Sequence, residues 1–195
     1  MTETISIETD YEKAFARAKE VLSSGGVLIY PTDTVYGVGG DARNPKVVER
    51  VKRIKGREDA VFSVLLGGME MVKEYAEVDG KALGAVMDAY PGATTLILKA
   101  KKELPVVKEG KIGVRVPEHI FMRKLSLELN MPIITTSANR SGGKAPVSVS
   151  EIDNEIVGEV DLVLDGGETL HRMNSTVIDV EEKKVKRVGV GEIIF

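Results

Sequence analysis

Residues 31–40 read Pro-Thr-Asp-Thr-Val-Tyr-Gly-Val-Gly-Gly and follow directly on the apolar run Val27–Tyr30. The run has the length and composition of a short buried strand, and the proline ends it. Small hydroxyl residues and three glycines then allow backbone and hydroxyl groups to come close to a small polar ligand. This stretch therefore predicts a buried strand that leads into a ligand-binding loop.

Three later segments repeat this combination of polar residues beside a strand-like run. They are Lys55-Gly56-Arg57, Thr135–Gly142 and Asn174–Asp179. Functional groups are commonly carried on loops that a rigid scaffold holds in place. Together the segments predict one polar, cationic pocket built from distant parts of the chain.

Strand-like and helix-like segments alternate along most of the 195 residues. Apolar spacing and capping residues predict helices over 11–24, 45–54, 79–90, from Pro117 onward, and over 150–157. Strands are predicted over 27–30, 61–66, 95–100, 112–116, 132–136 and 161–164, and a hairpin over 175–180 and 183–188. The alternation favours an α/β fold with a mixed sheet, formed as a single domain over residues 1–195.

Composition excludes several classes of site. The chain has no cysteine, so disulfides, thiolate metal sites and cysteine nucleophiles are ruled out. His119 and His171 are too few for a histidine-built metal site, and we expect them to make surface or polar contacts. The net charge of −3 gives no overall attraction to nucleic acid, so a basic site must be local. With neither a signal peptide nor a membrane-length apolar stretch, the chain is expected in the cytoplasm.

Lys55 and Arg57 are two cations separated by one glycine, and they can converge on an anion. The alternative is the solvated basic end of a helix, which is favourable to the helix dipole. Thr32 and Thr34 share one side if the segment is extended, so both hydroxyls can face a ligand. Their alternative role is to stabilise a turn by bonding to the backbone.

Ser137 and Asn139 alternate in the same way after the strand over 132–136. The asparagine amide can both donate and accept, although capping of a turn is a common alternative role for both residues. Arg115 lies in an apolar strand, where an unpaired guanidinium is costly. A buried ion pair or a bound carboxylate would resolve this cost, and Arg187 in the last strand poses the same question.

The order of these motifs resembles the YrdC-like family, the threonylcarbamoyl-AMP synthases of tRNA modification. The hallmark is a Lys-x-Arg pair followed much later by Ser-x-Asn, present here at residues 55–57 and 137–139. The resemblance extends to residues 31–39, Tyr90–Thr95, Val114–Pro117, Asn174–Asp179 and Arg187–Gly189. The sequence departs from the family at Glu58 and Val188, where family members usually have proline.

The resemblance implies a twisted open α/β sheet with flanking helices and a cationic concave face. It implies synthesis of L-threonylcarbamoyladenylate from L-threonine, bicarbonate or CO₂, and ATP, with release of pyrophosphate. It also implies that Mg²⁺ accompanies the nucleotide, and that a downstream threonylcarbamoyl-transfer machinery and tRNA are partners. The chain resembles the single-domain type of these synthases.

Carried onto this sequence, the resemblance assigns two groups of binding residues. L-Threonine would be held by Thr34, Arg115, Ser137 and Ser175. ATP would be held by Lys55, Arg57, Asn139, Arg187 and, more weakly, Ser148. Lys55 and Arg57 would also have the catalytic roles, with no obligatory protein nucleophile.

Two other functions remain open from the sequence. An RNA-binding module could use the same cationic concave surface to contact phosphates. The acidic total charge and the low aromatic content of 5% offer little for stacking single-stranded bases. A carbamoyl-transfer module like that of hydrogenase maturation proteins is disfavoured, because its companion domains and zinc cysteines are missing.

Overall fold

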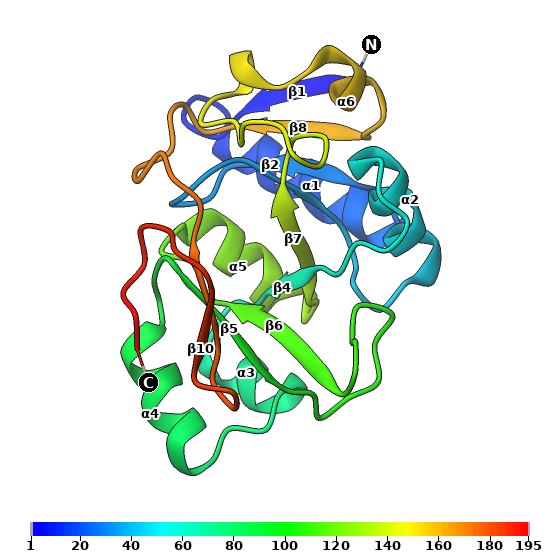
Figure 1. Ribbon diagram of the computed structural model, residues 1–195. Coiled ribbons are helices and arrows are strands. Elements are labelled where there is room, and N and C mark those ends of the chain that lie inside the picture. Colours follow the sequence, from blue (N-terminus) through cyan, green and yellow to red (C-terminus); the bar gives the residue numbers. More distant parts are fainter. Residues whose placement is uncertain (1, 195) are drawn as a thin grey trace.

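The computed structural model describes residues 2–194. Within that range the strands form one ten-stranded mixed sheet, in the order β1-β8-β2-β3-β7-β4-β6-β5-β9-β10 (Figure 1). The strands are β1 (Glu3–Ser6), β2 (Leu28–Tyr30), β3 (Gly37–Gly39), β4 (Ser63–Leu65), β5 (Thr94–Lys99), β6 (Lys111–Arg115), β7 (Ile133–Ser137), β8 (Leu162–Asp165), β9 (Thr176–Asp179) and β10 (Lys184–Arg187). The sheet is open and twisted, with β1 and β8 running across the direction of β7, which confirms the predicted fold class.

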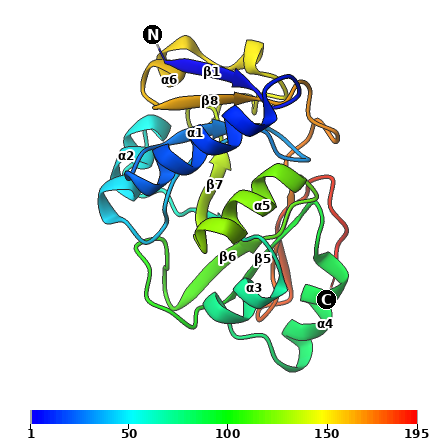
Figure 2. The ribbon, with the colours of Figure 1, turned by 180° about the vertical axis from the view of Figure 1, so that it is seen from behind.

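The helices that flank the sheet are α1 (Tyr11–Ser23), α2 (Pro45–Lys55), α3 (Met69–Tyr75), α4 (Gly80–Ala89), α5 (Ile120–Leu129) and α6 (Asn154–Gly158), with a 3₁₀ turn at Val149–Glu151. α1 and α5 lie over the face that is turned away in Figure 1, as the rear view shows (Figure 2). α2 and α6 pack on the other face of β2 and β8, because their apolar side chains share a core with Ile29 and Val163. α1 and α5 pack against each other behind the upper strands, and α4 packs against β5.

The ends of α2 follow from its sequence. The Asn44 side chain accepts a hydrogen bond from the Lys46 amide at 3.0 Å, and Pro45 occupies the first helical position. Gly56 ends the helix in the left-handed conformation, with a φ of 63°. The helix end is thus fixed between Lys55 and Arg57. At the start of α1, by contrast, the side chain of Asp10 makes no capping hydrogen bond.

Alternation along β5, β6 and β9 separates core residues from cavity residues. The set that is buried in the hydrophobic core comprises Leu96, Leu98, Ile112, Val114 and Ile178. The alternate set lines a cavity and comprises Thr95, Ile97, Gly113, Arg115, Val177 and Asp179. Over β5, β6 and β9 the sheet therefore has one face packed into the core and one face that carries polar side chains.

Three elements lie where the sequence predicted none: β1, α3 and β3. β3 was interpreted as part of a glycine loop, yet it pairs with β2 and β7. A side chain at Gly39 would place its Cβ 1.9 Å from the Ile134 carbonyl oxygen. Glycine is required here because the backbone of the neighbouring strand comes so close. A segment rich in glycine lacks the side-chain pattern of a strand, so the sequence did not predict β3.

The helix predicted from Pro117 begins three residues later, at Ile120. The Val116 carbonyl accepts a hydrogen bond from the Gly92 amide at 2.9 Å, which keeps the chain extended beyond β6. Phe121 and Leu125, four positions apart, are buried on one face of α5.

Gly39→Ala should lower the free energy of unfolding by about 3 kcal/mol, because the added methyl group overlaps the backbone of β7. Gly84→Ala is the matched control, since Gly84 lies in α4 and a Cβ added there would meet no heavy atom within 4 Å. The control should raise stability by about 1 kcal/mol through helix propensity. Urea unfolding of both variants checks this, and an equal effect in the two would contradict it.

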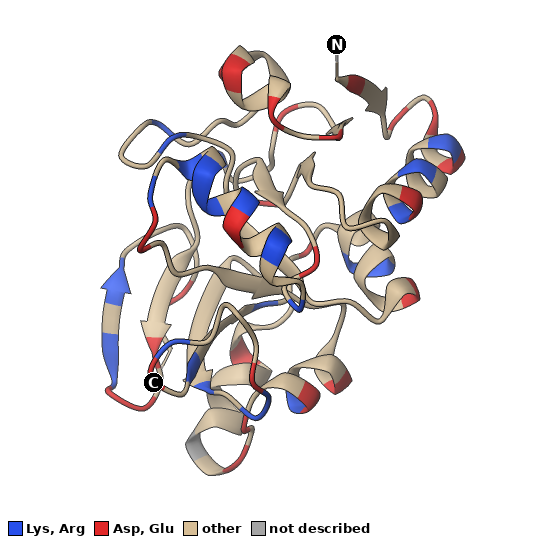
Figure 3. Cartoon of the chain, turned by 90° about the vertical axis from the view of Figure 1, so that its right-hand side faces the viewer, with Lys and Arg blue, Asp and Glu red and all other residues tan. Residues whose placement is uncertain are grey.

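Acidic and basic residues are mixed along the helices, as the colours of the cartoon show (Figure 3). The cationic concave face therefore remains a prediction. Across residues 2–194, no helix combines the length and apolar character needed to cross a membrane.

Candidate functional site

A cavity of about 440 Å³ opens on the polar face of the sheet. Its walls come from β3 to β7, from β9 and β10, and from the turn over residues 32–36. Five of the predicted site residues line it: Thr34, Arg115, Ser137, Ser175 and Arg187. A cavity of this size suits a small ligand, and most of these residues are far apart in the sequence.

Arg115 ends β6 and is 5% exposed. Its Nη1 donates to Thr34 Oγ1 at 2.6 Å, and its Nη2 donates to Asp33 Oδ1 at 2.7 Å. Its buried Nε has no acceptor among the described residues. A guanidinium has five N–H donors, so these contacts leave donors for a further acceptor. The buried ion pair that was predicted as one alternative for Arg115 is present, formed with Asp33. Arg115 still has N–H donors, free of partners in residues 2–194, that could bind a carboxylate.

Thr32 and Thr34 face each other through a turn rather than an extended strand. Their hydroxyl oxygens lie 2.9 Å apart, and the Thr34 amide donates to Thr32 Oγ1 at 3.1 Å. Thr32 Oγ1 also donates to the Val35 carbonyl at 2.7 Å. The predicted turn, stabilised by hydrogen bonds from a hydroxyl to the backbone, is therefore present. It holds Thr34 Oγ1 within hydrogen-bond distance of Arg115.

Ser175 and Arg187 form another part of the wall. Ser175 Oγ lies 2.9 Å from Thr95 Oγ1 and accepts from Arg187 Nη2 at 3.0 Å. Arg187 Nε donates to the Ser175 carbonyl at 3.0 Å. Burial lowers the pKa of Arg187, and the positive charge of Arg115 lowers it further. Two guanidinium groups near one another create a site that favours an anion.

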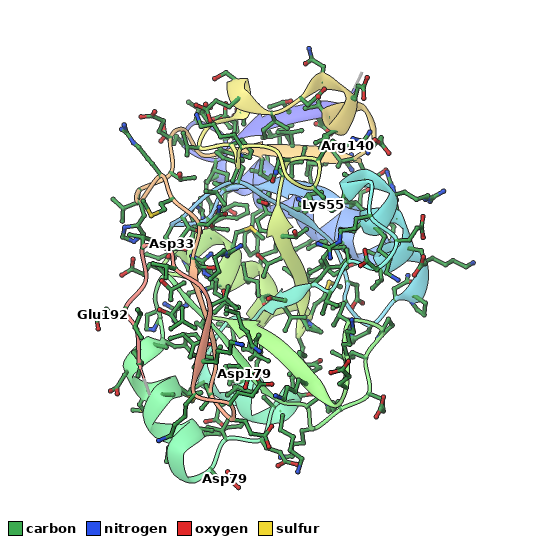
Figure 4. All side chains as sticks on the ribbon, in the orientation of Figure 1. Asp33, Lys55, Asp79, Arg140, Asp179 and Glu192 are labelled. Atoms are coloured by element: carbon green, nitrogen blue, oxygen red, sulfur yellow. The ribbon has the colours of Figure 1, made fainter. Side chains whose placement is uncertain are left out.

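Lys55 stands behind the cavity and does not line it. It is 6% exposed, and its Nζ donates to the carbonyls of Ser137 at 2.6 Å and Asn139 at 2.5 Å. Figure 4 shows Lys55 beside α2, on the same side of the molecule as Arg140, with Asp33 on the opposite side of β7. Lys55 therefore fixes the turn that carries the Ser-x-Asn motif.

Three predicted residues lie outside the cavity wall. Arg57 has a side chain that is 57% exposed, and its Nε donates to Asp59 Oδ1 at 2.8 Å. Asn139 Nδ2 donates to the Gly143 carbonyl at 2.7 Å. Ser148 Oγ lies 2.9 Å from Ser150 Oγ. In this structure Arg57 and Ser148 make these contacts within their own loops, whereas Asn139 Oδ1 also accepts from Lys55 Nζ at 3.3 Å.

The sequence interpretation missed a group of charged residues in the wall. They are Lys108, Glu109, Lys111, Asp179, Glu182 and Lys186. Lys111 Nζ pairs with Asp179 at 2.9 Å and with Glu182 at 3.0 Å. The sequence did contain an indication for Lys111, because strand alternation places it on the same face of β6 as Gly113 and Arg115. The pairing of Asp33 with Arg115 had no such signal.

Burial lowers the pKa of Lys55 to about 8, so this ammonium loses its proton as the pH rises through that value. We expect the NMR amide signals of Ala138 and Arg140, which adjoin the carbonyls of Ser137 and Asn139 that Lys55 contacts, to titrate with a midpoint near 8. The neutral Lys55→Met variant should lose this transition. If the wild-type signals do not change up to about pH 9.5, which lies beyond the expected midpoint, the lowered pKa of Lys55 is contradicted.

The model of the Sua5/YciO/YrdC family, described as "Telomere recombination", matches residues 20–189. A protein of Methanocaldococcus jannaschii is 35% identical over 188 residues, covering 95% of this chain and 89% of its own length. The chain belongs to the Sua5/YciO/YrdC family. A threonylcarbamoyl-AMP synthase of Pyrococcus abyssi is 32% identical over 188 residues, and the match covers 93% of this chain and 55% of the synthase.

Solved Sua5 and YciO structures share the fold. The crystal structure of Escherichia coli YciO has a TM-score of 0.88 and 30% identity, over 99% of this chain and 98% of YciO. The structure of P. abyssi Sua5 complexed with L-threonine has a TM-score of 0.85 and 29% identity, over 97% of this chain and 57% of Sua5. The family resemblance that the motifs predicted is confirmed.

Proposed function

We propose that this chain synthesises L-threonylcarbamoyladenylate from L-threonine, bicarbonate or CO₂, and ATP, and releases pyrophosphate. The observation that carries the proposal is Arg115, a buried cation in the cavity wall with N–H donors to spare, beside the hydroxyl of Thr34. The names of the P. abyssi relatives support it, one being a threonylcarbamoyl-AMP synthase and the other a Sua5 complexed with L-threonine.

In the proposed amino-acid subsite, Arg115 binds the carboxylate of threonine through its planar fork of donors. Thr34, Ser137 and Ser175 offer hydroxyls to the polar groups of the substrate. Their placement in one wall supports discrimination against L-valine, which would leave a buried hydroxyl without its partner.

In the proposed reaction, the threonine amine adds to CO₂ to form a carbamate, and a proton leaves the nitrogen. A carbamate oxygen attacks the α-phosphorus of ATP, and the bond from that phosphorus to its bridging oxygen breaks as pyrophosphate leaves. We assign Arg187, Arg57 and Asn139 to the nucleotide, with Ser148 as a weaker candidate, and Lys55 would act there by positioning the turn that carries Asn139. Cations at these positions would stabilise the charge that develops on the phosphates, and the cavity would align the two reactants.

Mg²⁺ is proposed to enter with ATP and to be held mainly by its phosphates. The cavity wall supports this arrangement, because Asp179 and Glu182 are engaged by Lys111 rather than set as a carboxylate cage. The product is proposed to pass to a threonylcarbamoyl-transfer machinery that modifies tRNA in the cytoplasm.

RNA binding is the less supported function. The cavity wall offers only Tyr36 and Phe62 as aromatic side chains, and bases bound as single strands usually stack on such rings. Two of its lysines, Lys111 and Lys186, are paired with Glu182. Any RNA affinity is proposed to be weak at physiological salt.

Calorimetry separates the two functions. We expect L-threonine to tighten ATP binding, L-threonine to bind better than L-valine, and RNA to bind weakly. RNA binding through phosphates would fall with salt at a log–log slope of about −0.7 per phosphate neutralised. Tight RNA binding with that steep dependence, together with no coupling between threonine and ATP, would overturn the synthase proposal.

A further inference from the structure

A second group of chemically active side chains lies outside the cavity wall. Asp33 follows β2, Glu118 follows β6 and His171 follows β8. One potential ligand atom from each residue lies within 4.8 Å of the others. His171 Nε2 is 3.2 Å from Glu118 Oε2. Three separate strand exits thus bring one imidazole and two carboxylates together.

Asp33 has a buried carboxylate, one oxygen of which is not satisfied within residues 2–194. Its side chain is 2% exposed, and its Oδ1 accepts from Arg115. Its Oδ2 is buried and has no hydrogen-bond partner among the described residues. A buried carboxylate oxygen without a partner is costly, and such exceptions in native structures call for an explanation. A cation shared with Glu118 and His171 would satisfy this oxygen.

The backbone holds the group together. The His171 amide donates to the Asp33 carbonyl at 2.8 Å, and Thr169 Oγ1 donates to the Thr34 carbonyl at 2.8 Å. The loop after β8 is therefore tied to the turn after β2. Glu118 and His171 keep partly exposed side chains, which provide a path for an ion from solvent.

We propose that Asp33, Glu118 and His171 bind a divalent first-row transition-metal ion of the Zn²⁺ type, with water completing the coordination. Imidazole favours such ions over Mg²⁺ and Ca²⁺, and carboxylates are compatible with them. The other carboxylate oxygen of Asp33, Oδ1, continues to accept the hydrogen bond from Arg115. The metal site is separate from the Mg²⁺ that accompanies ATP.

The site is coupled to the amino-acid subsite through Asp33, a step that rests on the proposed function. A cation on Oδ2 offsets the negative charge that Asp33 presents to Arg115. Arg115 then attracts a substrate carboxylate more strongly, so the metal tightens threonine binding. By linkage, threonine tightens metal binding by the same factor.

Calorimetric titration of the untagged, EDTA-treated full chain with ZnCl₂ tests the site without any substrate. We expect one Zn²⁺ per chain, with MgCl₂ binding far more weakly. His171→Ala and Glu118→Gln should each weaken Zn²⁺ binding at least about tenfold, the lower end of losses known even for outer-shell residues. Glu70→Gln, which changes an exposed glutamate that pairs with Lys73, is the matched control and should bind like the wild type.

The metal proposal is overturned if Zn²⁺ does not bind, or if the two variants bind it as tightly as the wild type. Thermal unfolding in EDTA confirms that the variants are folded, since both replaced side chains are partly exposed. A second titration measures L-threonine with and without ZnCl₂. Equal threonine affinities overturn the coupling, whereas Zn²⁺ binding with no threonine binding upholds the metal site and counts against the proposed function.

Discussion

Arg115→Ala should lower the free energy of unfolding by about 3–5 kcal/mol, among the largest effects expected in this chain. The change leaves the carboxylate of Asp33 buried without its cation and removes the donor to Thr34 Oγ1. Urea unfolding of the variant and the wild type measures the loss. A loss under about 1 kcal/mol, the usual value for an exposed pair, would mean that Asp33 is not held by Arg115.

Arg115→Lys separates this structural role from ligand binding. Lysine keeps the charge beside Asp33 but loses the planar fork, so the fold should survive. L-Threonine should bind about tenfold more weakly or worse, since a hydrogen bond to a charged group is lost. ATP affinity measured without threonine should hardly change. Equal losses for both ligands would mark Arg115 as a structural ion-pair partner only.

Arg57→Ala should lower kcat by about 10²–10³-fold while the protein remains folded. The proposed role of Arg57 is to stabilise charge on the phosphates, although its guanidinium contacts Asp59 in this structure. The side chain is largely exposed, so its removal creates no cavity in the core.

Asp59→Ala is the control for that variant, because it removes the same ion pair and leaves the guanidinium in place. We expect this control to keep most of the wild-type turnover. Near-wild-type turnover of a folded Arg57→Ala protein would remove Arg57 from the mechanism. Equal losses in both variants would point to the loop geometry instead.

Local patterns predicted much of the fold. The helix predicted over 45–54 matches α2, and the strands predicted over 95–100 and 112–116 match β5 and β6. The strand β3 was hidden, because glycines that admit a neighbouring backbone look like glycines of a loop. Local propensity does not report contacts between distant segments.

Within the site, the sequence identified several of the residues that line the cavity, but it did not identify most of their contacts. Arg115 and Thr34 were predicted and lie 2.6 Å apart through Nη1 and Oγ1. The partnership of Arg115 with Asp33 joins segments 82 positions apart and had no local signal. Lys55 was expected to face a ligand, yet its ammonium supports the Ser137 turn from behind.

We propose that the protein makes threonylcarbamoyladenylate in a single cavity. The most direct test is incubation of the chain with ATP, L-threonine and ¹³C-bicarbonate, followed by mass spectrometry of the products and a pyrophosphate assay. We predict a ¹³C-labelled adenylate that forms with equimolar pyrophosphate and disappears when any one substrate is omitted. Pyrophosphate formation without threonine, or no labelled adenylate from folded protein supplied with all three substrates and Mg²⁺, would contradict the account.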